Sequence, residues 1–276
     1  MKKTPKLLIL AGTVLAFLFL FGIIFYNNFI KKSIYEENSQ HLLSTYEQVD
    51  KTFTMFVQHN WNALSDWSNN LQYLDDAENM KTLWYDFARR KDAWQYQDFY
   101  MFNENCDFIT AAGRDGNAPN IQGIFLDMYK TGQPVISSYI ASDSNRRIVF
   151  ALPMDVPYTI NGITYSGLAV SYNNDVVEKL IAGNIYQGQS DCYILTSDGN
   201  VLLSLEPKTE FLQKISNLFD FLNKYTNMTE TEITDLKKNI KNVSTGSLQC
   251  RYNNKNYYLV YEPTGINDWT IVGIIH

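Results

Sequence analysis

The chain carries the same strand, turn and strand pattern twice, about ninety residues apart. The first copy is FYMFNENCDFITA, from Phe99 to Ala111, and the second is CYILTSDGNVLLS, from Cys192 to Ser204. Each copy has an aromatic strand, a polar turn and an apolar strand, which is the pattern of a β-hairpin. Similarity at such a long period indicates that a unit larger than a hairpin is repeated.

The elements that follow the two hairpins also come in the same order. Each hairpin is followed by a helical connection and then by three apolar strands, the second of which ends in a proline, Pro153 or Pro263. A proline at the end of a strand does not break an interior ladder. Each half therefore predicts a five-stranded antiparallel sheet with helices on one face, an α+β arrangement. The predicted strands are PVISSYI, RRIVFALP and ITYSGLAVSY in the first half, and GSLQCRY, YYLVYEP and DWTIVGII in the second.

An apolar run near the N-terminus predicts a membrane anchor. Leu7–Phe25 contains nineteen residues without a charge, which as a helix cover ~28 Å and match a hydrocarbon core of ~30 Å. A cleaved signal peptide is the alternative, but the run is longer than an ordinary signal core and no small-x-small cleavage site follows it. Three lysines precede the run, so the positive-inside rule places the N-terminus in the cytoplasm. We expect a protein of the cell membrane whose residues after about 30 are extracytoplasmic.

A long helix is predicted after the anchor. Apolar residues recur at steps of three and four, with one gap at Asn60, and neither proline nor glycine occurs from Asn27 to Met80. A helix from Lys31 to Leu74 would extend ~66 Å, which suits a stalk. One alternative is an amphipathic core helix alone. The other is a helix whose stripe packs on the folded domain above and also pairs with a second copy near the membrane, which would make a homodimer. The stripe consists of Leu42, Tyr46, Val49, Phe53, Phe56, Leu64, Trp67, Leu71 and Leu74.

These patterns divide the chain into four parts. Residues 1–30 are the cytoplasmic N-terminus and transmembrane anchor, and residues 31–75 are the stalk helix. Residues 76–186 and 187–276 are the two repeated modules.

Charge and cysteine content exclude several classes of protein. The net charge is −6, and without the three lysines before the anchor 20 basic side chains face 29 acidic ones, a net charge of −9. This balance disfavours a nucleic-acid partner. Cys106, Cys192 and Cys250 have neither zinc-site spacing nor the even number of a disulfide framework. A bridge between Cys192 and Cys250 stays open at this point.

No catalytic or metal-binding constellation is predicted. The histidines are His41, His59 and His276, two of them on the stalk and one at the end of the sequence, so a histidine-based metal cluster or a Ser/His/Asp arrangement is not expected. The glycines of GRDG and SDGN suit turns rather than phosphate loops. We therefore expect no enzyme, no cofactor and no metal site within this chain.

A small-molecule pocket in the first module is the remaining chemical hypothesis. Its candidates are Tyr100 and Phe102 on the first hairpin, Tyr139 on PVISSYI, Arg147 on the next strand, and Tyr165 facing them. The guanidinium of Arg147 could hold a ligand carboxylate. Taken singly, each aromatic residue is better explained by core packing and Arg147 by a solvated strand end, so the hypothesis concerns the cluster.

The whole pattern resembles the double Cache family of sensor domains. The resemblance lies in SDGNVLLS, in PVIS…RRIVFALP…NGITYSGLAVSYNNDVVEKLI and in NDWTIVGII. It implies two PAS-like modules on a long helix, the first far from the membrane and binding a small molecule. It also implies output through a second transmembrane helix to a histidine kinase, diguanylate cyclase or chemoreceptor domain. No second apolar run occurs before His276; we expect a fragment of a longer receptor, and a separate output protein is the alternative.

The resemblance does not extend to the amino-acid-binding members. These carry Arg-x-Trp-Tyr after the first hairpin and an acidic residue just past the strand equivalent to SGLAVSY. Here the first region reads GIFLDMYKTG and the second position falls at or near Tyr172, so an amino-acid ligand is not supported. Two functions are expected: a ligand-sensing ectodomain that signals through the stalk helix, or a membrane-tethered structural or adhesion module without a ligand.

Overall fold

The computed structural model describes residues 4–71, 77–118, 121–141, 145–182, 190–205 and 215–275. It divides into two compact units, residues 1–45 and residues 46–276, which we call the N-terminal unit and the two-sheet unit. Helix α1, Thr4–Leu71, contributes to both. The predicted boundaries at 75/76 and 186/187 fall outside the described residues.

The described part of the N-terminal unit is helical. The side chains of Phe17–Phe25 are described, and the apolar ones among them are exposed. One helix in the described chain, α1, is long and apolar enough to cross a membrane, and none of its most apolar window is buried. This is the property expected of the predicted anchor.

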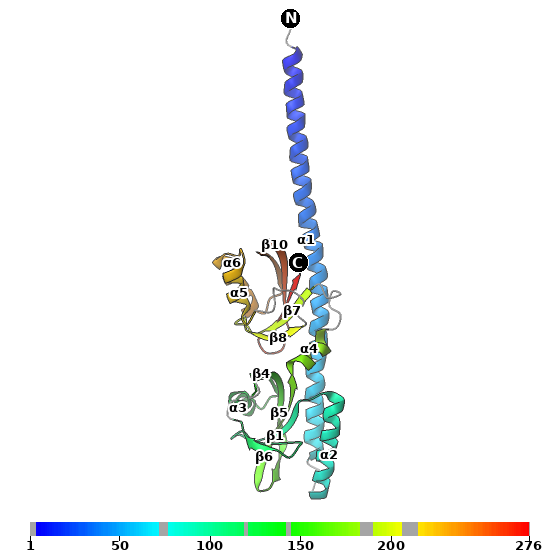
Figure 1. Cartoon of the computed structure of the whole chain (residues 1–276), viewed down its shortest axis with the longest axis vertical. Helices are drawn as coiled ribbons and strands as arrows, with labels where there is room; N and C mark the ends of the chain where they lie inside the picture. The colour runs from blue at the N-terminus through cyan, green and yellow to red at the C-terminus, as the bar shows by residue number, and fades with distance from the viewer. Residues whose placement is uncertain are drawn as a thin grey trace. The chain divides into compact units, whose positions relative to one another are not determined.

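The two-sheet unit contains a six-stranded and a five-stranded antiparallel sheet (Figure 1). The first has the order β3-β2-β1-β6-β5-β4 and the second β8-β7-β11-β10-β9. Without β3 the two orders are the same, so the repeat read from the sequence is a repeat of a sheet. The strands are β1 (Asp98–Phe102), β2 (Asp107–Thr110), β3 (Asp115–Asn117), β4 (Val135–Ile140), β5 (Arg146–Ile160), β6 (Ile163–Asn173), β7 (Ser190–Leu195), β8 (Val201–Leu205), β9 (Gly246–Tyr252), β10 (Lys255–Pro263) and β11 (Thr270–Ile275).

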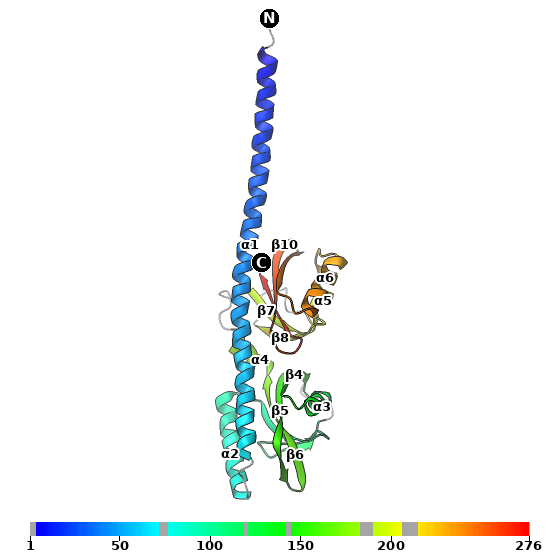
Figure 2. The same ribbon diagram turned by 180° about the vertical axis from the view of Figure 1, so that it is seen from behind.

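Each sheet has its own helices. The first module, β1–β6, carries α3 (Gln122–Thr131), and the second module, β7–β11, carries α5 (Leu218–Tyr225) and α6 (Glu230–Lys241). Figures 1 and 2 show α3 over the first sheet, and α5 and α6 over the second. Two further helices are α2 (Ala77–Trp94), which runs beside α1, and α4 (Asn174–Ala182), which follows β6.

Two details of the first sheet differ from the sequence prediction. Five strands were expected, but the polar segment read as a loop contains β3, which pairs with β2. Gly113 turns the chain back with a φ of 73°, and the Thr110 hydroxyl accepts a hydrogen bond from the Arg114 amide at 3.1 Å. The strand expected to end at Pro153 continues to Ile160 after a register shift, because a proline without an N–H interrupts a ladder without having to end the strand.

From Tyr46 to Leu71, helix α1 packs its apolar stripe on both modules. Phe53 stacks on Trp269 with ring centroids 6.0 Å apart, and Trp67 meets Phe99 edge to face at 4.9 Å. The gap in the stripe at Asn60 is also filled: Asn60 is 1% exposed, and its Oδ1 accepts a hydrogen bond from the Tyr172 hydroxyl at 2.8 Å. The predicted amphipathic helix is therefore a core element of this unit.

Candidate ligand-binding site

A cavity of about 390 Å³ lies in the first module, between the sheet and α3. Its volume falls within the range of small-molecule sites. Side chains from β1, β2, β3, β4 and β5 line it together with the start of α3. The lining consists of Asp98, Tyr100, Phe102, Cys106, Phe108, Thr110, Arg114, Asp115, Asn117, Ala118, Ile121, Phe125, Tyr139, Ala141 and Arg147.

The structure brings four of the five sequence-predicted site residues together. Tyr100, Phe102, Tyr139 and Arg147 line the cavity, whereas Tyr165 is buried outside the lining. Tyr139 and Arg147 are direct partners across β4 and β5, so they reach the cavity side by side.

The alternation of β1 explains which of its residues reach the cavity. Asp98, Tyr100 and Phe102 line it, while Phe99 between them packs against Trp67 on the α1 side. Successive side chains of a strand point to opposite faces. On the neighbouring strand β6, Ser171 points to the cavity side, because its Oγ lies 3.0 Å from the Tyr100 hydroxyl.

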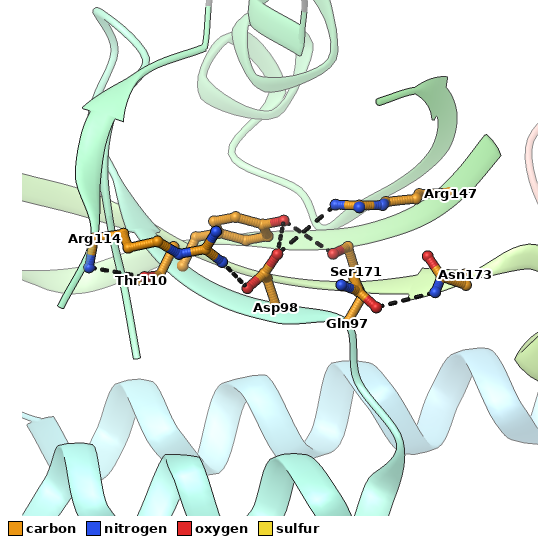
Figure 3. A network of polar contacts seen from close by, with 8 residues as sticks. Gln97, Asp98, Thr110, Arg114, Arg147, Ser171 and Asn173 are labelled. Atoms are coloured by element: carbon orange, nitrogen blue, oxygen red, sulfur yellow. Dashed lines mark hydrogen bonds and ion pairs between the residues drawn. The ribbon is translucent and has the colours of Figure 1, made fainter. Parts of the chain in front are cut away.

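Asp98 is the centre of a polar network at one end of the cavity (Figure 3). Its Oδ1 accepts from Arg114 Nη2 at 2.8 Å. Its Oδ2 lies 3.7 Å from Arg147 Nη1 and accepts from the Tyr100 hydroxyl at 3.4 Å. One carboxylate thus meets two guanidinium groups and one phenol.

Two members of this network are nearly buried. The Asp98 side chain is 10% exposed and that of Arg147 is 13% exposed, whereas Arg114 is 66% exposed. A buried charge is stable only when it is paired and hydrogen-bonded. Burial raises the pKa of the Tyr100 phenol, and the neighbouring Tyr139 and Asp98 raise it further, so this hydroxyl stays protonated and can donate.

The opposite end of the cavity is apolar and is covered by α3. Phe102 and Phe125 stack with centroids 3.8 Å apart. A Cβ at Gly167 would lie 2.5 Å from Phe102 Cζ, so glycine on β6 makes room for that ring. The Tyr129 hydroxyl donates to the Phe102 carbonyl at 3.2 Å and accepts from Ser166 Oγ at 3.1 Å. These hydrogen bonds connect α3 to β1 and β6.

Sequence reasoning missed Asp98, Arg114 and Ser171. Asp98 stands two residues before Tyr100, so the period of two that selected Tyr100 and Phe102 also marks it. Arg114 lies in GRDG, which was read as turn chemistry alone. No sequence signal indicated Ser171, because only the pairing of β1 with β6 brings it to Tyr100.

The position compared with the acidic residue of amino-acid-binding members lies on the other face. Tyr172 bonds to Asn60 of α1 and Phe56 of α1 meets its ring at 5.2 Å, so it does not line the cavity. Among the described residues, no group of three or more His, Cys, Asp or Glu side chains could hold a metal ion.

The three cysteines are free and buried. The bridge between Cys192 and Cys250 that the sequence left open is therefore not formed. Cys106 lines the cavity, and burial, followed by Asp107, raises the pKa of its thiol.

Comparison with known proteins gives its matches at the level of structure. No family model and no curated protein matches the chain. The sensory domain of the Campylobacter jejuni chemoreceptor Tlp3 with isoleucine bound superposes with a TM-score of 0.58 at 11% identity, covering 88% of this chain and 94% of that one. The ligand-binding domain of the Pseudomonas aeruginosa PAO1 amino acid chemoreceptor PctB in complex with L-Arg gives 0.60 at 13%, covering 86% and 87%.

A third similar structure is the extracellular domain of the putative histidine kinase mmHK1S-Z3, with a TM-score of 0.56 at 14% identity, covering 84% of this chain and 94% of that one. The chain has the fold of these sensory domains. The α+β fold predicted from the sequence, with two PAS-like modules on a long helix, is thereby confirmed.

Proposed function

We propose that this chain is the ligand-sensing region of a membrane signalling receptor, and that the cavity of the first module binds a small molecule. The observation that carries the proposal is the cavity itself, in which the nearly buried Asp98 and Arg147 meet beside a wall of aromatic rings. A mostly apolar cavity with a small number of polar groups is typical of small-molecule sites. Structures of the same fold that were solved with isoleucine or L-Arg bound support a sensing role.

Arg147 is the anchor that we propose for an acidic group of the ligand. Its guanidinium carries five N–H donors in a planar fork that matches a carboxylate. Tyr139, its direct strand partner, and Tyr100 would complete the polar end of the site.

The membrane arrangement belongs to the same proposal. The run Leu7–Phe25 would cross the cell membrane with the N-terminus in the cytoplasm, and residues after about 30 would be extracytoplasmic. Output would then pass through a kinase, cyclase or chemoreceptor partner domain. No catalytic role is proposed for this chain, since the similar structures are sensory and ligand-binding domains.

A homodimer remains part of the proposal, with the pairing of two copies near the membrane. From Tyr46 to Leu71 the apolar stripe of α1 is buried within the same chain. Pairing along this stretch would therefore use the outer face of α1, which is polar apart from Met55, 72% exposed.

Thermal unfolding with a metabolite screen tests the sensing role. The full chain in detergent micelles is melted with representatives of acidic, basic and neutral metabolites, since a ligand that binds the folded state raises the melting temperature. Arg147→Gln should abolish the shift given by an acidic ligand, whereas Arg146→Gln, at the neighbouring exposed position, should leave it unchanged. Absence of a shift with every class would favour the alternative, a membrane-tethered structural or adhesion module.

A further inference from the structure

The charges that line the cavity are two arginines and two aspartates, Arg114, Arg147, Asp98 and Asp115. Asp115 is an exposed residue of the edge strand β3. Burial, followed by the charge of Asp115, raises the pKa of Tyr165, which lies outside the lining. An exposed carboxylate at the rim contributes little to binding. The nearly buried charges of Arg147 and Asp98 balance each other, and the exposed Arg114 adds a second guanidinium group that is paired with Asp98.

The carboxylate of Asp98 already has hydrogen-bond and ion-pair partners within the protein. Arg114 occupies Oδ1 at 2.8 Å, and Oδ2 has Arg147 at 3.7 Å and the Tyr100 hydroxyl at 3.4 Å. A ligand ammonium group would compete with these donors for the same two oxygens. Because the side chains of Asp98 and Arg147 are only 10% and 13% exposed, removing one partner would leave a buried charge uncompensated, which is strongly unfavourable.

A ligand carboxylate meets the opposite situation. It can use guanidinium donors without displacing Asp98, because two guanidinium groups carry more N–H groups than one carboxylate can accept. The two arginines thus favour an anion, and the occupied aspartate disfavours a cation next to it.

The rest of the cavity is suited to an apolar body. Phe102 and Phe125 stack at 3.8 Å, Phe108 meets Tyr100 edge to face at 5.9 Å, and Ile121 completes this wall. Burying an apolar chain or ring of the ligand here would supply most of the binding free energy, while the arginines would fix its orientation.

From these observations we infer that the site selects a monocarboxylate with an apolar body and without an ammonium group beside the carboxylate. The class comprises unsubstituted, 2-hydroxy and 2-oxo acids. The inference rests on the proposed function, and it names the ligand class of the same cavity.

Matched pairs of compounds test this selection by isothermal titration calorimetry on the full chain in detergent micelles. The first set is 4-methylpentanoate and 2-hydroxy-4-methylpentanoate against leucine, and the second is 3-phenylpropanoate and 3-phenyllactate against phenylalanine. We expect the acids without an amine to bind at least about tenfold more tightly, a difference typical of one polar group that has no partner in a site.

Asp98→Asn separates the two explanations by the sign of its effect. It removes the negative charge with little change of size, so carboxylate affinity should be kept or increased. If Asp98 instead holds a ligand ammonium, the same variant should abolish amino-acid binding. Arg114→Gln, at a side chain 66% exposed, is a second variant with little risk to folding and should weaken carboxylate binding several-fold. Circular dichroism confirms that each variant is folded.

The experiments can refute the proposed ligand class and the proposed sensing role separately. Tighter binding of leucine or phenylalanine than of the paired acids would overturn the ligand class while leaving a sensing role intact. Failure of all four acids in the titration, with a melting shift given by another metabolite class, would do the same. Failure of every metabolite class in the thermal screen would remove the sensing role as well.

Discussion

Replacing Gly273 by alanine tests how α1 is held to the second sheet. A Cβ at residue 273 of β11 would lie 1.9 Å from Cε2 and Cζ of Tyr46. Carbon atoms in contact are ~3.5–4.0 Å apart, so the ring would have to move by about 1.5–2 Å. Tyr46 has little room to move, because it is 1% exposed and its hydroxyl donates to the Asp191 carbonyl at 3.3 Å.

The cost follows from these contacts. Forcing extra volume into a packed core costs about 1–3 kcal/mol, and losing the Tyr46 hydrogen bond costs about 1 kcal/mol more. The free energy of unfolding should therefore fall by about 2–4 kcal/mol. For a folded region of this size, that corresponds to a melting temperature lower by roughly 5–15 °C. Thermal unfolding of the full chain in detergent, followed by circular dichroism, measures it.

Two further variants assign the effect to the contact with Tyr46. Gly123→Ala is the control: no atom lies within 4 Å of its added Cβ and it stands in α3, so it should stabilise the protein by up to about 1 kcal/mol. In a Tyr46→Ala background, Gly273→Ala should cost less than about 0.5 kcal/mol, because the ring it meets is gone. The reasoning is refuted if Gly273→Ala is equally costly with and without the ring, or if it unfolds like the wild type.

Three other perturbations have defined outcomes. Burial and then Glu47 raise the pKa of Asp50 from 3.8 to about 6, so the stabilisation given by its neutral form is fully present below about pH 4 and is lost as the pH rises through about 6. Asp50→Asn should remove this pH dependence and raise the free energy of unfolding at pH 8 by roughly 1 kcal/mol, allowing for solvent screening. Urea unfolding at several pH values measures both effects. Tyr172→Phe removes the 2.8 Å bond to the buried Asn60 and should lower the free energy of unfolding by about 1–3 kcal/mol in the same assay. The three cysteines are free and buried, and burial raises the pKa of the Cys192 and Cys250 thiols. A thiol reagent should therefore modify Cys192 and Cys250 only in denaturant, and a reductant should leave the melting temperature unchanged.

The repeat of strands was predictable from the sequence because alternation and turn residues are local signals. The two sheets have the same strand order apart from β3, as the two hairpins and the strand triplets indicated. The edge strand Asp115–Asn117 was not predictable, because its residues are typical of a loop and only pairing with β2 makes it a strand. For the same reason, Pro153 could not reveal that β5 resumes pairing at Tyr158.

The sequence predicted which face of the sheet carries the candidate site, but not how far the site extends along each strand. A period of two places Tyr100 and Phe102 on one face of β1, and the structure puts both in the cavity lining. Tyr165 lies an even number of residues from Gly167 and Ser171, so alternation places it on the same face of β6. However, β1 ends with Phe102 opposite Gly167, two residues before β1 would reach Tyr165. How far a cavity extends along a strand depends on the neighbouring strand and the covering helix, and neither is set by local sequence.

The same alternation links the cavity to helix α1. Ser171 and Tyr172 are adjacent on β6 and point to opposite faces: Ser171 contacts Tyr100 at 3.0 Å, and Tyr172 bonds to Asn60 of α1 at 2.8 Å. Packed interiors transmit small displacements because they contain few voids. A ligand that shifts β6 from the cavity side must therefore move the partner of α1 on the other side or break its bond. Under the proposed sensing role, this strand would connect ligand binding to the stalk helix, and the Tyr172→Phe variant would test signalling as well as stability.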